Sequence, residues 1–169
     1  KIKYGLVQSK KQTRGKGTYG KKWISQEGNF FASIFFSLKK KYPPFNEFSF
    51  INPILISKII MYFCKKGKVN LKFPNDILLN KKKVCGILQE IVTLNSNKFL
   101  IIGIGINTIK NPNINKKYKA TNILLETKKK TENNKIINLI KYSYEKFLTN
   151  IDSYKYINFK KKSEQLAQN

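Results

Sequence analysis

The sequence contains no histidine and only two cysteines, Cys64 and Cys85, among its 169 residues. The lack of histidine excludes Ser-His-Asp triads and His-rich zinc sites, so any metal has to be a hard ion with oxygen ligands, such as Mg²⁺. Both cysteines lie in apolar surroundings, and two thiols make no disulfide framework. We therefore expect a protein of the cytoplasm or another reducing compartment.

Long apolar runs are missing as well. No segment approaches the roughly 20 apolar residues that a membrane-spanning helix requires, and the first residues do not have the pattern of a signal peptide. The chain has 41% hydrophobic and 13% aromatic residues, which is typical of a globular protein. Its length predicts a single domain over residues 1–169.

Acidic residues are scarce: nine aspartates and glutamates stand against 34 lysines and arginines, for a formal net charge of +25. Such a charge raises the question of nucleic-acid binding. Arginine, whose planar guanidinium grips phosphate at two points, occurs once, at Arg14, while lysine, asparagine and isoleucine are abundant everywhere. A general compositional drift explains the charge more simply, so we expect neither nucleic acid nor a membrane as a partner.

The order of apolar segments and turns predicts an α+β fold, with a mixed, largely antiparallel sheet and flanking helices. Asn52 and Pro53 have the pattern of a helix N-cap followed by proline at the first helical position, which predicts a helix ending near Cys64. Two more helices are expected, over residues 135–150 and from about Ser153. Strands are expected over residues 3–8, 30–38, 69–73, 77–79, 84–92 and 99–106, with a surface loop at 107–122.

A glycine-rich segment over residues 12–23 gives the first functional signal. Gly15, Gly17 and Gly20 match the spacing of the dinucleotide-binding fingerprint. That fingerprint also requires a helix after the glycines and an acidic residue about 20 positions later, and the sequence predicts neither. The Rossmann interpretation therefore fails, and a plain hairpin loop remains as the simplest alternative.

The cations of this segment favour a ligand-binding loop over a plain hairpin. Glycines let backbone N–H groups approach a ligand, and Lys16, Lys21 and Lys22 are partners for an anion. Trp23, the single tryptophan, is either a core residue or a platform for a ring-bearing ligand, and its position in the loop favours the platform. We expect a pocket for an anionic, ring-bearing ligand, most simply a nucleotide.

A second polar segment, Lys-Phe-Pro-Asn-Asp at residues 72–76, ends a predicted strand. An Asx-turn is the plain interpretation. With Lys83 on the following hairpin, a buried polar cluster is favoured, in which Asp76 needs Mg²⁺ or a lysine as its partner. Residues 103–107 are similar: their glycines indicate close backbone approach or relief of crowding against helices, and the strand ends on the amide of Asn107.

Taken together, these segments resemble the catalytic domain of biotin protein ligases, the biotin–acetyl-CoA-carboxylase ligases. Their order and spacing agree over most of residues 5–110. The motifs are Gln12-Thr13-x-Gly15-Lys16-Gly17-x-x-Gly20-Lys21-x-Trp23, then Ser25 and Gly28, Lys72-Phe73-Pro74-Asn75-Asp76-Ile77, Lys83-x-x-Gly86-Ile87-Leu88-x-Glu90 and Ile102-Gly103-Ile104-Gly105-Ile106-Asn107. The resemblance implies the class-II-synthetase-like sheet of that family.

The resemblance also implies an activity: formation of biotinyl-adenylate from biotin and ATP with Mg²⁺, then transfer of biotin to a lysine of a carboxyl carrier (acceptor) domain. Catalytic roles are implied for Lys83, Asp76 and Lys16, with Asp76 also the metal partner. The implied biotin-binding residues are Gln12, Gly15, Lys16, Lys83 and Gly86. The implied nucleotide-binding residues are Gly17, Gly20, Lys21, Trp23, Asn75 and Asn107.

Some features depart from the family pattern. Thr18 stands where the family usually has an arginine that contacts phosphate. The Ser-Thr-Asn segment that caps the biotin ring in the family, and its small C-terminal SH3-like domain, are not found within residues 1–169. Two alternatives stay open: a lipoate or octanoyl ligase of the same superfamily, and a decayed, non-catalytic basic binding protein. Family members often pair through a sheet edge, so a homodimer is also open.

Overall fold

A computed structural model describes residues 4–112 and 119–168 of the chain. Six strands form one sheet in the order β1-β2-β6-β5-β4-β3, and every neighbouring pair is antiparallel. This arrangement confirms the predicted α+β fold with a largely antiparallel sheet. The strands are β1 (Tyr4–Ser9), β2 (Phe30–Ser37), β3 (Val69–Lys72), β4 (Asp76–Leu79), β5 (Lys82–Leu94) and β6 (Asn97–Ile106).

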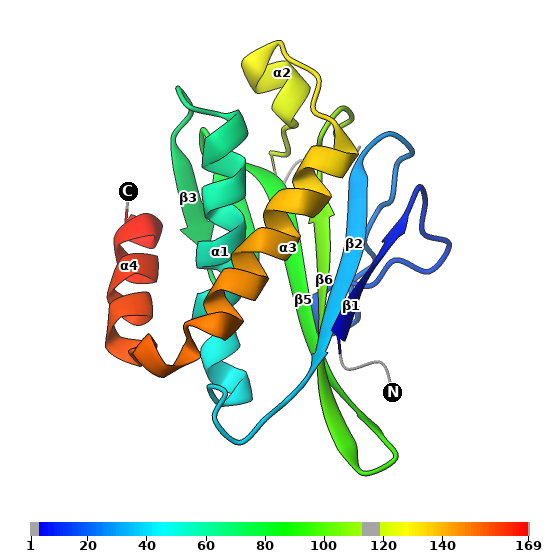
Figure 1. Ribbon diagram of the computed structural model, residues 1–169. Helices are drawn as coiled ribbons and strands as arrows, with labels where there is room; N and C mark the ends of the chain where they lie inside the picture. Colours follow the sequence, from blue (N-terminus) through cyan, green and yellow to red (C-terminus); the bar gives the residue numbers. More distant parts are fainter. Residues whose placement is uncertain (1–3, 113–118, 169) are drawn as a thin grey trace.

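Helices cover one face of this sheet, where α1, α3 and α4 lie in front of the strands in Figure 1. The segment between β1 and β2 lies on the other side. No helix in the described residues is long and apolar enough to span a membrane. The helices are α1 (Phe48–Phe63), α2 (Ile123–Thr127), α3 (Asn133–Thr149) and α4 (Tyr156–Gln168), with 3₁₀ turns at Thr18–Gly20, Phe45–Glu47 and Ile151–Ser153.

The hydrophobic core fills the space between the sheet and the helices. Side chains of a strand alternate between its two faces, so every second residue of β6 enters this core. Leu100, Ile102, Ile104 and Ile106 are at most 3% exposed and belong to the same buried cluster as the apolar residues of α1. The residues between them point to the opposite face of the sheet, and the segment between β1 and β2 lies over that face.

The predicted start of the first helix is wrong. α1 begins at Phe48, directly after a 3₁₀ turn, so Asn52 and Pro53 lie inside the helix. Pro53 cannot donate to the carbonyl of Ser49 and removes one helical hydrogen bond. Asn52 is fully buried; its amide donates to Gln89 Oε1 at 3.0 Å, and its oxygen accepts from the Tyr144 hydroxyl at 2.9 Å. Asn52 therefore links the helices to the sheet and does not cap the helix.

The predicted loop over residues 107–122 is only partly a surface loop. Its described part has no helix, but its two ends are buried, and residues 113–118 lie outside the described part. Asn29 holds the first end, because its Oδ1 accepts the backbone N–H groups of Thr108, Ile109 and Lys110 at 2.9–3.1 Å. At the second end Asn122 caps α2, a helix that the sequence pattern did not predict, by accepting from the Leu125 N–H at 2.7 Å.

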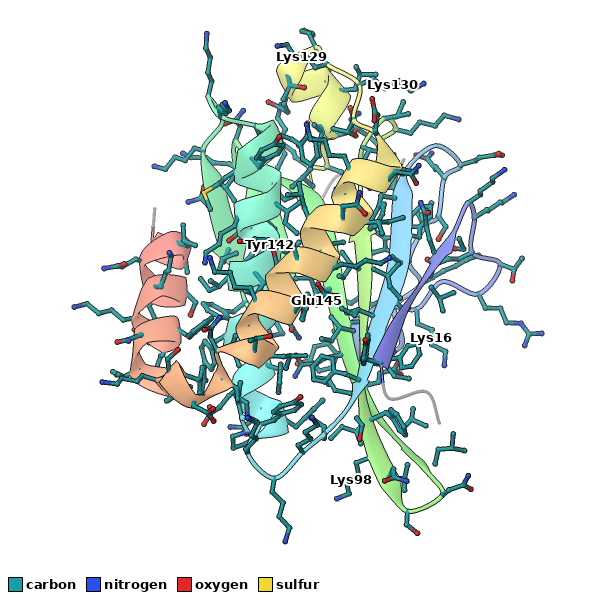
Figure 2. The ribbon with its side chains drawn as sticks, viewed as in Figure 1. Lys16, Lys98, Lys129, Lys130, Tyr142 and Glu145 are labelled. Carbon is teal, nitrogen blue, oxygen red and sulfur yellow. The ribbon has the colours of Figure 1, made fainter. Side chains whose placement is uncertain are left out.

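The lysines that give the chain its charge project from several parts of the molecule. Figure 2 shows Lys129 and Lys130 beyond α2, Lys98 on the β5–β6 hairpin and Lys16 on the segment after β1. Lys129 and Lys130 are neighbours, whereas Lys98 and Lys16 lie in other regions of the molecule. Their spread agrees with a compositional origin of the charge.

Candidate active site

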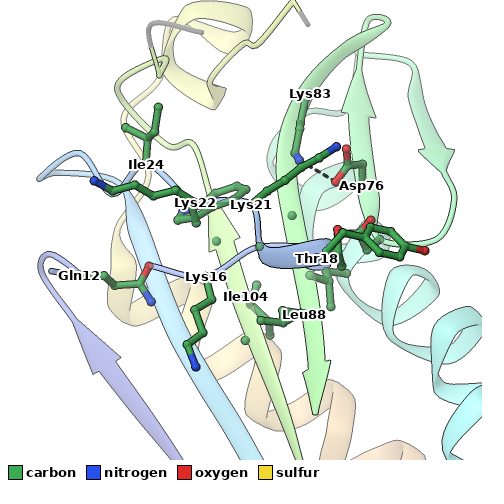
Figure 3. A pocket seen from close by; sticks show the side chains of 18 of the residues that line it. Gln12, Lys16, Thr18, Lys21, Lys22, Ile24, Asp76, Lys83, Leu88 and Ile104 are labelled. Carbon is green, nitrogen blue, oxygen red and sulfur yellow. Dashed lines mark hydrogen bonds and ion pairs between the residues drawn. The ribbon is translucent and has the colours of Figure 1, made fainter. Parts of the chain in front are cut away.

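A pocket of about 580 Å³ lies on the face of the sheet that the helices leave open (Figure 3). Residues of β5 and β6 form its floor, and the turn at residues 72–76 contributes one wall. Residues 12–23, here named the cationic loop, lie across it. Its charged lining residues are Arg14, Lys16, Lys21, Lys22, Lys72, Lys83, Asp76 and Glu90.

The cationic loop is an irregular hairpin held together by its own backbone. The Trp23 N–H donates to Gly15 O at 2.9 Å and the Gly17 N–H donates to Lys21 O at 2.6 Å, while Lys16 and Lys22 form a β-bridge. Gly15 is buried and has no room for a side chain, because a Cβ there would lie 2.6 Å from Trp23 O. The hairpin can close in this shape only with a glycine at position 15.

Trp23 anchors the loop to the sheet through two glycines. A Cβ on Gly86 would lie 2.5 Å from the indole Cζ3, and a Cβ on Gly105 would lie 2.5 Å from Cζ2. The two glycines are opposite each other in the β5–β6 pairing. The ring fits only because neither position carries a side chain, so the space directly above Gly86 belongs to Trp23.

Gly103 is different, because the space above it is open. A Cβ there would meet only Leu88, at 3.7 Å or more. Gly103 pairs with Leu88 on β5 and Ser33 on β2, and all three line the pocket. Sequence reasoning did not assign Ser33 or Leu88 to the site. The sequence of β6 contained a signal for this open floor, because its glycines alternate with large core residues.

An ion pair lies at one end of the pocket. Lys83 Nζ is 2.7 Å from Asp76 Oδ1, and the two side chains are 21% and 11% exposed. The same ammonium lies 5.3 Å from the centroid of the Trp23 ring, within the range of a cation–π contact. The backbone of Lys83 is fixed by the segment before α2, since its N–H donates to Lys119 O and its carbonyl accepts from the Thr121 N–H, both at 2.9 Å.

Three buried polar atoms of the pocket have no hydrogen-bond partner among the described residues: Trp23 Nε1, Asn107 Oδ1 and Asp76 Oδ1. Asp76 Oδ1 has the ion pair with Lys83, so the other two are without any partner of this kind. The other end of the Asn107 amide donates to Thr121 O at 3.1 Å, which fixes its orientation. A buried donor and a buried acceptor are costly when they stay unpaired. One donor and one acceptor in residues that line the pocket are therefore left without a partner.

Two side-chain contacts hold the rim. The Ser25 hydroxyl donates to Gln12 Oε1 at 2.7 Å, and Asn75 Nδ2 lies 3.5 Å from Thr18 Oγ1, a long contact between the turn and the cationic loop. The carbonyl of Asn75 also accepts from the Ile87 N–H at 2.9 Å. The turn at residues 72–76 is thereby tied to β5.

A thiol lies just behind the site but takes no part in its chemistry. Cys85, next to Gly86 on β5, is fully buried. Burial raises the pKa of the Cys85 thiol far above its usual value, although the charge of Lys83 acts in the opposite direction. The thiol stays protonated and is no nucleophile at neutral pH.

Most of the residues predicted for the site line this one pocket. Gly20 is an exception, since it lies in the loop at a φ of 70° but outside the lining, and so is the buried Gly15. Lys16 lines the pocket, but Figure 3 shows its side chain extending away from Asp76 and Lys83. Arg14, Thr18 and Glu90 also line the pocket but were not predicted as site residues, whereas Lys22 was expected as a partner for an anion. The predicted residues in the lining are Gln12, Lys16, Gly17, Lys21, Trp23, Asn75, Asp76, Lys83, Gly86 and Asn107.

A comparison with known families completes this picture. The model of the biotin/lipoate A/B protein ligase family matches residues 2–107. The chain belongs to this family. The match includes the cationic loop, the turn at residues 72–76, the Lys83 hairpin and the glycines of β6, which are the parts that build the pocket.

Individual members of the family show where this chain is similar. It is 34% identical over 112 residues to the bifunctional ligase/repressor BirA of Bacillus subtilis (strain 168), covering 64% of this chain and 34% of that protein. It is 28% identical over 103 residues to the biotin–[acetyl-CoA-carboxylase] ligase of Paracoccus denitrificans, covering 60% and 43%. The alignments thus span less than half the length of these curated relatives.

A solved structure is similar over almost the whole chain. The biotin protein ligase from Aquifex aeolicus in complex with biotin and ATP matches with a TM-score of 0.81 at 27% identity. The match covers 99% of this chain and 70% of that one. The fold of the described chain is therefore shared with that ligase.

Proposed function

We propose that the protein forms biotinyl-adenylate from biotin and ATP and transfers the biotin to a lysine of a carboxyl carrier (acceptor) domain. One observation carries the proposal: an open glycine floor, an anchored indole and a lysine–carboxylate pair line the same pocket, in a chain of the biotin/lipoate ligase family. The similarity to a ligase in complex with biotin and ATP supports the choice of substrates.

The open part of the floor suits the ring of biotin. Gly103 and Leu88 supply an apolar surface without a side chain above the glycine. Gln12 lies in the same lining; its oxygen accepts from Ser25, which leaves its amide N–H groups to donate to the ureido carbonyl of biotin. A lipoyl or octanoyl chain has no such polar ring, so this side chain favours biotin over the alternative substrates.

The adenine of ATP suits the unpaired atoms near Trp23. Trp23 Nε1 donates and Asn107 Oδ1 accepts, and an adenine ring carries both ring-nitrogen acceptors and an amino donor. The cations of the lining face the triphosphate, which carries several negative charges. We therefore assign Trp23 and Asn107 to the nucleotide, together with Gly17, Gly20, Lys21 and Asn75 of the surrounding backbone and rim.

Lys83 is the main catalytic residue in this proposal. A carboxylate oxygen of biotin attacks the α-phosphorus of ATP, the bond to pyrophosphate breaks, and negative charge builds on the phosphoryl oxygens. A fixed ammonium in a partly dry pocket stabilises that charge. The backbone contacts of Lys83 with Lys119 and Thr121 hold it in place. Lys16 lines the same pocket, and its side chain has to turn toward Lys83 to contact the carboxylate.

Asp76 serves the second step. The acceptor lysine must be neutral when it attacks the acyl carbon, because an ammonium has no lone pair. Asp76, close to Lys83, orients this amine and takes its proton as AMP leaves. Within the described residues no group of three or more carboxylates or thiols could cage a metal. Asp76 fits a Mg²⁺ ion that arrives with ATP, since Mg²⁺ is commonly held by one or two carboxylates and by substrate phosphates.

The wider context of the activity is part of the proposal. Residues 1–169 would form one catalytic domain, acting in a reducing compartment, which suits two free and buried cysteines. The near absence of arginine, which occurs once, argues against a dedicated nucleic-acid surface. A homodimer is also compatible with this proposal, and a measurement of the molecular mass in solution tests it.

The deciding experiment is biotin-dependent exchange between ATP and pyrophosphate, which reports adenylate formation alone. We expect exchange with biotin and Mg²⁺ and none with lipoate or octanoate. Lys83→Ala should lower the rate at least about 100-fold, the usual scale for loss of one group that stabilises transition-state charge. Lys98→Ala, on the far hairpin, is the matched control and should leave the rate unchanged.

Two results would contradict the proposal. Exchange driven by lipoate in place of biotin would favour the lipoate ligase. Absence of exchange, together with nucleic-acid binding that weakens steeply with salt, would favour the basic binding protein.

A further inference from the structure

Glu126 on α2 is a largely buried carboxylate that has no role in the proposed mechanism so far. Its side chain is 13% exposed. Three donors converge on it: Asn80 Nδ2 at 2.7 Å, the Thr121 hydroxyl at 2.5 Å and Lys82 Nζ at 3.5 Å. The hydrogen bond from Thr121 is the main cause of the lowered pKa of Glu126, so the group is ionised at neutral pH. Hydrogen bonds to an ionised acceptor are roughly twice as strong as neutral ones, so Glu126 fixes the side chains that donate to it.

Thr121 connects this carboxylate to the pocket. The residue is fully buried, and each of its polar groups has a partner. Its hydroxyl donates to Glu126, its N–H donates to the Lys83 carbonyl at 2.9 Å, and its own carbonyl accepts from Asn107 Nδ2 at 3.1 Å. Lys83 and Asn107 line the pocket, whereas Glu126 and Thr121 are not among the described lining residues. A change at Glu126 therefore reaches the pocket through one intermediate residue.

The same carboxylate holds the turn between β4 and β5. Asn80 and Lys82, which donate to it, come from this turn and from the start of β5. Asn80 and Lys81 have positive φ values of 51° and 63°, which residues other than glycine adopt rarely. The two strands of this hairpin carry the carboxylate and the lysine of the ion pair. Glu126 therefore clamps the hairpin against the segment that orients Asn107.

We infer that Glu126 is a positioning residue of the reaction, acting through Thr121. It holds the Asn107 amide toward the nucleotide and keeps the backbone of Lys83 in place. The inference rests on the proposed function and adds a residue to it. Asn107 offers its oxygen to adenine only while its N–H group donates to the Thr121 carbonyl, because half a turn of the amide would offer a donor in that place.

The contact should matter for the nucleotide and not for biotin. A displaced Thr121 releases the Asn107 amide, so binding of ATP weakens. It also lets the backbone of Lys83 shift, and a small misplacement of a catalytic group slows the chemical step. The open floor at Gly103 lies on β6 and pairs with β2 and β5, so it does not depend on Glu126.

The test measures the affinity of the full chain for an ATP analogue that cannot release pyrophosphate, by calorimetry with biotin present. Glu126→Gln keeps the shape of the side chain and removes its charge and one acceptor. We expect the Kd of the analogue to rise about tenfold, the scale of one lost hydrogen bond to the ligand. The Kd of biotin alone should stay within about twofold. Glu145→Gln, exposed on α3 (Figure 2), is the matched loss of charge and should leave both Kd values unchanged.

This readout separates positioning from a loss of folded protein. Fewer folded molecules would lower the number of binding sites per chain and leave the Kd of the remaining sites unchanged. A raised Kd for the analogue, with the wild-type number of sites and the wild-type Kd for biotin, is expected only if the nucleotide contacts themselves have changed.

Variants of Thr121 show whether the effect passes through its hydroxyl. Thr121→Val removes the hydroxyl at similar shape and should weaken binding of the analogue as Glu126→Gln does, whereas Thr121→Ser keeps it and should retain most of the affinity. The double variant should lose no more than one single variant, because both changes remove the same contact. Additive losses would overturn the inference. The comparison of valine with serine stands even if Glu126→Gln folds poorly.

Separate outcomes distinguish the two proposals. Wild-type affinity for the analogue in Glu126→Gln, or an equal loss in Glu145→Gln, would overturn the inference and leave the ligase proposal intact. Weaker binding in Glu126→Gln alone, together with a wild-type chain that shows no biotin-dependent exchange, would support the inference and refute adenylate formation. A wild-type chain that binds no analogue would overturn both.

Discussion

The two faces of strand β6 carry opposite kinds of residue. On the helix side, Leu100, Ile102, Ile104 and Ile106 fill the core with large apolar groups. On the pocket side, Gly103 and Gly105 alternate with them and leave space. On the first face, large side chains stabilise the fold by filling the core. On the second face, the lack of side chains leaves the space that a ligand needs. One stretch of ten residues thus serves both the fold and the site, because successive side chains point in opposite directions.

The pocket face is itself divided. Gly105 supports Trp23, which occupies the position where a side chain would stand, whereas Gly103 has no protein atom above it within ordinary contact except Leu88. Two glycines only two residues apart therefore have separate purposes. One anchors the cationic loop, and the other leaves room for a substrate.

The largest effect is expected on the helix face. Ile102→Ala removes a fully buried side chain and leaves a cavity, which should lower the free energy of unfolding by about 2–5 kcal/mol. Ile101→Ala is the matched change on the other face, where the side chain is partly exposed, and should cost about 1 kcal/mol or less. Urea unfolding measures both. Equal losses would contradict the division between the faces.

An intermediate effect should separate the two glycines. Gly105→Ala forces Trp23 from its seat, which should cost about 1–3 kcal/mol of stability and change the fluorescence of this single tryptophan. Gly103→Ala meets no close atom, so stability should change by about 0.5 kcal/mol or less.

Ligand binding sharpens this contrast. The methyl group of Gly103→Ala occupies the open floor, so biotin affinity should fall by about tenfold or more. Calorimetry with biotin measures it. A Gly103→Ala variant with wild-type biotin affinity would place the ring elsewhere in the pocket.

The smallest effect concerns the segment behind Lys83. A hydrogen bond from the Thr121 hydroxyl, with others from Asn80 and Lys82, lowers the pKa of the Glu126 carboxyl below its usual 4.5. A group with a lowered folded-state pKa stabilises the fold above its usual pKa and loses this contribution as the pH falls. Glu126→Gln should therefore cost up to about 1 kcal/mol at neutral pH.

The pH series provides the control for Glu126. The difference in unfolding free energy between wild type and Glu126→Gln should shrink as the pH falls below about 4.5, because the wild-type carboxyl then becomes protonated. A difference that stays constant down to about pH 3 would show that Glu126 acts through its shape and not through its charge.

Much of the fold could be predicted from local patterns. β-Branched and aromatic runs between turn residues marked the strands, and Asn95 and Ser96 turn the β5–β6 hairpin at positive φ values of 47° and 63°. Local patterns failed where a long-range contact decided the outcome. Asn52 looked like a helix cap, but its partners Gln89 and Tyr144 are 37 and 92 positions away.

The site, too, could be predicted only as far as local patterns in the sequence reach. Spacing along the chain singled out the cationic loop, the turn at residues 72–76 and Lys83 as partners of one ligand. It gave no means to see that the indole of Trp23 rests on Gly86 and Gly105, or that Gly103 stays open. These facts depend on the register of β5 with β6, which no local pattern specifies.

The amino-acid sequence by itself determined the family, the charge of the loop and the identities of the polar side chains, because these are properties of residues and their order. Only the tertiary structure decided which side chains meet: that Lys83 pairs with Asp76, that Lys16 turns away, and that Lys21 extends toward the ion pair. Pairing of strands far apart in the chain brings these groups to one face, and no residue carries that information alone.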